Sequence, residues 1–81
     1  MNLHLQPVQV ATGSNDQESR LVFADGLLVA ILVRLSTMHG ADAGRWHMEA
    51  GFGHIHDAIA PTFADLDEVQ TWIADHLSAP L

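Results

Sequence analysis

The sequence predicts an α+β domain: a three- to four-stranded antiparallel sheet followed by one C-terminal helix that packs on one face of the sheet. Three observations lead to this fold class. Residues 19–35 read SRLVFADGLLVAILVRL, two apolar runs of strand formers joined by Asp25-Gly26. Residues 45–52, RWHMEAGF, alternate between apolar and polar side chains. Residues 66–78 carry apolar side chains at helical spacing.

The turn between the two apolar runs determines the expected strand pairing. Asp-Gly between strand formers is typical of a two-residue type I′ turn, because both central residues need a positive φ. Strands over 19–24 and 27–35 then pair with Val22 opposite Val29. Both faces of this hairpin are apolar, whereas a half-solvated strand alternates apolar with polar residues. One of these faces carries Leu21, Phe23, Leu28, Ala30 and Leu32.

The chain offers one helix, which can cover one face of the sheet. We therefore predict that the apolar patch from Leu21 to Leu32 is an interaction surface, because patches of several hundred Å² usually mark such sites. Two-fold pairing with a second copy is the commonest way to bury a patch of this kind. The expected assembly is a homodimer.

The remaining elements follow from local signals. An N-terminal strand is expected over about 2–10, and Pro7 confines it to an edge of the sheet or to a bulge. A third stretch, 45–52, forms another strand. The helix over about 66–78 begins with Asp65 as its N-cap and Glu68 as the partner in a capping box. Its apolar stripe consists of Leu66, Val69, Ile73 and Leu77.

Size and composition bound the function. The 81 residues form one domain, 1–81, and there is no cysteine for disulfides or thiolate sites. The start of the chain lacks the pattern of a signal peptide, and its longest apolar run is far shorter than the roughly 20 residues that span a membrane. We expect a cytoplasmic protein that has no membrane partner.

The charge of the chain is strongly acidic. Three arginines and no lysine stand against ten carboxylates, which gives a formal net charge of −7. Three scattered arginines do not form the basic face of a nucleic-acid binder, so no nucleic-acid partner is expected. An acidic inhibitor or nucleic-acid mimic that binds a basic protein partner is the alternative function. Its carboxylates would form one contiguous stripe.

A histidine-rich stretch is the candidate metal site. His47 and Glu49 share one face of the expected strand, about 7 Å apart, and His54 and His56 form an H-x-H pair soon after. Imidazole and carboxylate groups at such spacing suit a divalent transition metal. A His-based metal-binding module is thus a second alternative, weighed against ordinary solvated histidines.

The sequence holds no residue set for catalysis. Its serines lie in loops or at chain ends without the glycines of a nucleophile elbow, and Gly51-x-Gly53 is too short to cradle phosphate. We expect neither an enzyme nor a bound cofactor. The predicted function is a small non-catalytic interaction protein, and the pattern leaves open which process it serves.

The junction between the last strand and the helix carries a family resemblance. Strand Arg45–Phe52, then Thr62-Phe63-Ala64-Asp65 leading to Glu68-Val69-Gln70-Thr71-Trp72-Ile73, is similar to small βββα modules. One such module is the AP2-like arm domain of phage integrases, in which a three-stranded sheet reads DNA. The resemblance covers about the last 60 residues and implies a sheet followed by a helix. The basic residues that family uses on its sheet are missing here, where strand 27–35 offers Arg34.

Overall fold

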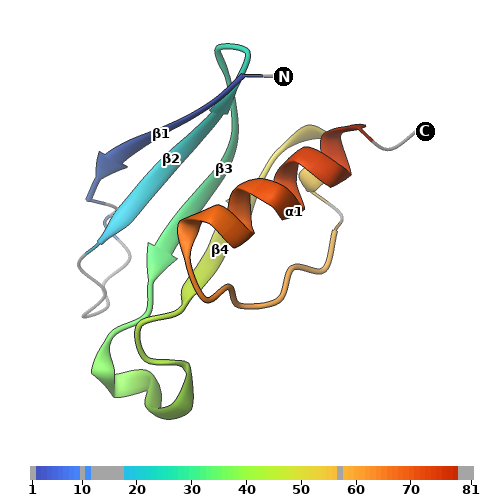
Figure 1. Cartoon of the computed structure of the whole chain (residues 1–81). Coiled ribbons are helices and arrows are strands. Elements are labelled where there is room, and N and C mark those ends of the chain that lie inside the picture. The colour runs from blue at the N-terminus through green and yellow to red at the C-terminus, as the bar shows by residue number, and fades with distance from the viewer. Residues whose placement is uncertain (1, 10, 12–17, 57, 79–81) are drawn as a thin grey trace.

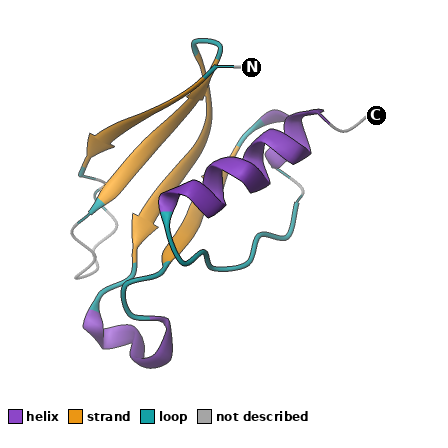
Figure 2. Ribbon diagram, viewed as in Figure 1, coloured by secondary structure: helices purple, strands orange, loops and turns teal. Residues whose placement is uncertain are grey.

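The computed structural model describes residues 2–9, 11, 18–56 and 58–78. Strands β1 (Leu3–Val8), β2 (Ser19–Ala24), β3 (Leu27–Arg34) and β4 (Trp46–Gly51) form one antiparallel sheet in that order. The helix α1 (Leu66–Ser78) lies across one face of the sheet (Figure 1, Figure 2). Short 3-10 helices, η1 (Thr37–Asp42) and η2 (Gly53–Ile55), flank β4 in the chain. The predicted α+β arrangement is confirmed, with four strands before the helix.

Pro7 lies in β1, an edge strand as predicted, whose strand neighbour is β2. The carbonyl of Asn2 accepts a hydrogen bond of 2.9 Å from the backbone N–H of Asp25, so the peptide groups of Asn2 face β2. Peptide groups alternate in direction along a strand, which makes those of Pro7 face away from the sheet. The missing N–H of proline therefore removes no hydrogen bond between the strands.

The hairpin turn has the predicted conformation, but the pairing beyond it differs from the prediction. Asp25 and Gly26 have φ values of 50° and 87°, as a type I′ turn requires. After two pairs the register shifts, and Val22 lies opposite Ala30 instead of Val29. Val29 is the extra residue of a β-bulge, which lets both it and Ala30 join the core.

A second bulge interrupts β4 in the same way. Met48 pairs with Leu32 and Ala50 pairs with Ile31, which leaves Glu49 as the extra residue. The expected uniform alternation over 45–52 is therefore wrong beyond Met48. Gly51 takes the core side instead of Ala50, and the core there has no room for a side chain.

The core lies between α1 and the sheet. The side chains of Val22, Ala30, Leu32, Val69 and Ile73 are completely buried there. Phe63 closes one end: it exchanges backbone hydrogen bonds of 2.7 and 2.8 Å with Trp46, and its ring meets the Trp72 ring edge-on at 5.7 Å.

The start of α1 is held by the predicted capping box. The carboxylate of Asp65 accepts a hydrogen bond of 2.8 Å from the backbone N–H of Glu68. The carboxylate of Glu68 reaches back to the N–H of Ala64 at 3.0 Å. One free N–H group of the first helical turn and the N–H just before the helix are thus satisfied, and the apolar stripe of α1 is aimed at the sheet.

Candidate interaction surface

The sheet surface turned away from α1, here called the outer face, is apolar along its centre. Because Val22 and Ala30 belong to the core beneath α1, the neighbours of these residues point the other way, except Val29 at the bulge. Residues that pair across strands lie on the same face of the sheet, so the pairs identify the outer-face residues of β2, β3 and β4. The partly exposed apolar side chains among them are Leu21, Phe23, Leu28, Ile31 and Ala50.

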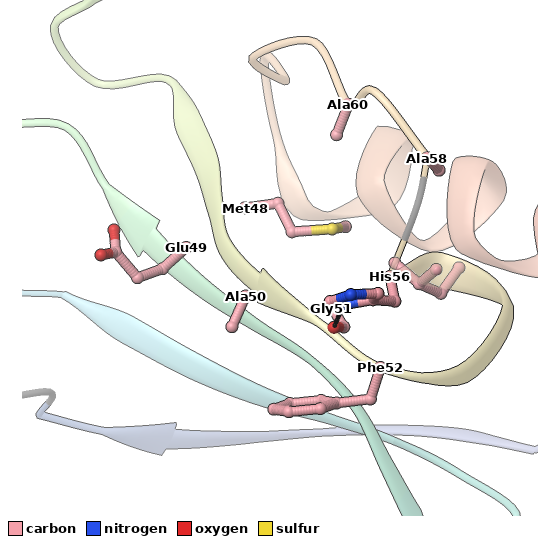
Figure 3. A pocket seen from close by; sticks show the side chains of 9 residues that line it. Met48, Glu49, Ala50, Gly51, Phe52, His56, Ala58 and Ala60 are labelled. Carbon is pink, nitrogen blue, oxygen red and sulfur yellow. Dashed lines mark hydrogen bonds between the residues drawn. The ribbon is translucent and has the colours of Figure 1, made fainter.

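On β2 and β3, the exposure of the outer-face side chains increases toward the hairpin turn. At the far end, Ser19 and Val33 lie opposite each other and both are 2% exposed. Near the turn, Leu28 is 37% exposed and Phe52 is 42% exposed. Phe52 follows Gly51 in extended conformation, and Figure 3 shows its ring pointing away from Met48 and His56. The apolar patch is therefore concentrated at the turn end of the face.

The predicted interface residues divide between the two sides of the sheet. Leu21, Phe23 and Leu28 lie on the outer face. Ala30 and Leu32 are completely buried in the core beneath α1. The bulge at Val29 causes this division, because one extra residue moves every later side chain of β3 to the opposite face. In the folded chain, Ala30 and Leu32 are therefore not part of the surface.

The outer face carries little charge in an otherwise acidic chain. Glu49 is the single carboxylate among the residues of the four strands. It points to the outer face beside His47, with 3.9 Å between the carboxylate Oε2 and the imidazole Nε2. On β1, the ring of His4 lies 6.2 Å from that of Phe23. The other described carboxylates lie outside the strands, in the connections and on α1.

The three arginines are engaged within the chain. Arg20 lies over the ring of Trp46, 5.3 Å from its centroid. Arg34 donates a hydrogen bond of 3.0 Å to the carboxylate of Glu18. Arg45 donates one of 2.8 Å to the hydroxyl of Thr62. These cations stabilise loops and the edges of the core.

The structure brings two of the four metal-ligand candidates into direct contact. His47 and Glu49 are neighbours on the outer face of β4, as predicted. His54 lies in η2, and the ring of His56 is 3.4 Å from the carbonyl oxygen of Gly51. Within the part of the chain that the structure describes, no three histidine, aspartate or glutamate side chains gather as metal ligands.

A cleft that sequence reasoning missed lies on the other side of β4. It has a volume of about 440 Å³ between the strand and the chain that follows it, with Met48, Ile55, Ala58 and Ala60 among its walls (Figure 3). The cleft opens where the chain before Phe63 diverges from β4 beyond the Trp46–Phe63 bridge. Its lining is mainly apolar, and Glu49 and His56 are the titratable residues that border it. No sequence pattern marks it, because it depends on the path of a loop.

Comparisons with known proteins provide no family assignment. No protein-family model matches the chain, and neither the curated proteins nor the solved structures include a significant match. Among the described residues, no helix has the length and apolar character needed to cross a membrane.

Proposed function

We propose that this chain is a small non-catalytic interaction protein that forms a homodimer through its outer face. The observation that carries the proposal is the apolar strip of Leu21, Phe23, Leu28 and Ile31 on the sheet surface that α1 leaves uncovered. An antiparallel sheet with one face in water normally alternates apolar and polar residues, and these strands do not. Burial of the strip against another protein surface supplies the favourable free energy of association.

The distribution of charge favours a second copy as the partner. Two chains of net charge −7 repel each other, so a self-contact is most favourable where carboxylates are few. The strands contain Glu49 as their one carboxylate. A basic partner would instead bind the carboxylates outside the strands, on α1 and in the connections. A two-fold axis makes the same apolar strip serve both copies.

The two adjacent leucines at the turn provide a matched test. Leu28 is 37% exposed on the outer face, whereas Leu27 is 73% exposed and pairs with Ala24 on the opposite side of the sheet. Light scattering on a sizing column, over a range of protein concentrations, should show a dimer for the parent chain and for Leu27→Glu. For Leu28→Glu we expect a dissociation constant at least about tenfold higher, or about 1.4 kcal/mol of lost association energy.

Two results would contradict the proposal. One is a parent chain that stays monomeric throughout the micromolar range. The other is an equal effect of Leu27→Glu and Leu28→Glu, which would assign association to a surface other than the outer face. Circular dichroism of both variants checks that neither substitution unfolds the chain.

A further inference from the structure

The pair of His47 and Glu49 has the atoms and the spacing of half a metal site. The imidazole Nε2 and the carboxylate Oε2 are 3.9 Å apart, and both side chains are close to half exposed. Tetrahedral zinc with bonds of about 2.0–2.1 Å places neighbouring ligand atoms about 3.3–3.4 Å apart. Small side-chain rotations on β4 therefore suffice to bring both atoms onto one ion.

One copy of the chain supplies too few ligands at this place. Structural zinc sites use four protein ligands, and the described residues give His47 and Glu49 no third partner of suitable type. Both side chains project from the outer face, and Figure 3 shows Glu49 pointing away from the cleft side of β4. A two-fold axis that passes beside β4 would place two such pairs opposite each other.

The spacing between the two packed sheets and the charges that meet there are both compatible with one metal ion shared by the two copies. Packed sheets lie about 10 Å apart, so each side chain must reach about 5 Å from its own strand, which is within the length of an imidazole or glutamate side chain. Pairing the outer faces also brings together two copies of Glu49, the one strand carboxylate. A divalent cation between them converts this repulsion into attraction.

We propose, on the basis of the self-association described above, that the dimer binds one divalent transition-metal ion through His47 and Glu49 of both copies. The site is incomplete in a single chain. The metal strengthens the dimer, while the apolar strip provides association in its absence.

Zinc chloride and a chelator test this proposal on the tag-free full chain. Light scattering at several protein concentrations, with EDTA or with zinc, measures the dissociation constant of the dimer in each condition. We expect zinc to lower it at least about tenfold, corresponding to about 1.4 kcal/mol, and titration calorimetry to give one zinc per two chains. His47→Ala and Glu49→Gln should each abolish the zinc effect. His54→Ala removes another exposed histidine and should leave that effect intact.

The outcomes separate this inference from the proposed function. A dimer that zinc does not strengthen, or one in which His54→Ala removes the zinc effect, overturns the shared site and leaves self-association standing. Binding of one zinc per chain to a monomer also overturns it. A chain that remains monomeric both with EDTA and with zinc overturns both proposals.

Discussion

At the scale of single residues, Gly51 shows how the second bulge connects β4 to η2. A Cβ at this position would lie 2.6 Å from Cγ2 of Ile55 and 3.1 Å from its carbonyl oxygen. Ile55 is 1% exposed and belongs to the core, so it has little room to move. Gly51→Ala should therefore lower the free energy of unfolding by about 1–3 kcal/mol through overpacking, as measured by urea denaturation.

A double-mutant cycle identifies the cause of that loss. In an Ile55→Ala background the closest contact of the new methyl group is absent, so Gly51→Ala should cost less there than in the parent chain. Equal costs in both backgrounds would show that the two residues do not interact.

The backbone conformation was predicted correctly where it depends on the chemistry of the residue itself. The prediction failed at the two bulges. Asp25-Gly26 marks its turn because glycine adopts a positive φ at low cost. The residue types of Val29 and Glu49 do not signal a bulge, because the position of an extra residue in a strand depends on how the neighbouring side chains pack. The same reason explains why Leu21, Phe23 and Leu28 were placed correctly on one face and the later residues of β3 were not.

At the scale of elements, the N-terminus of α1 depends on its capping box. Asp65→Ala removes the acceptor for the N–H of Glu68 and should cost about 1 kcal/mol of the free energy of unfolding. Asp67 lies in the first turn and acts mainly through the helix dipole, so Asp67→Ala should cost only a few tenths of a kcal/mol. Thermal or urea unfolding of the two variants measures the difference, and a larger loss for Asp67→Ala would contradict this assignment.

The limits of the elements were predictable to different degrees. Helix α1 has the predicted range, 66–78, because caps and apolar periodicity are local signals. The connection that follows β4 carries no local signal of structure, yet it contains η2 and the buried Ile55. Whether one isoleucine in a loop is buried depends on the sheet and helix around it. The cleft beside β4 depends on the same tertiary packing, and therefore it could not be predicted from the sequence.

At the scale of the whole molecule, the uneven distribution of charge leads to a test of what drives association. Two chains of net charge −7 repel over long range, while the outer face contributes mainly apolar contacts. Raising sodium chloride from about 0.05 M to about 0.5 M shortens the range of this repulsion severalfold.

With EDTA present to exclude metal, the dimer dissociation constant should therefore fall or stay constant as salt rises. Sodium sulfate should lower it further, because it strengthens apolar burial. Sedimentation equilibrium across the salt series measures the trend, with Leu28→Glu as the control that lacks the apolar contact. A dimer that dissociates as salt increases would instead be held by ion pairs, and the carboxylates outside the strands would then replace the outer face as the contact surface.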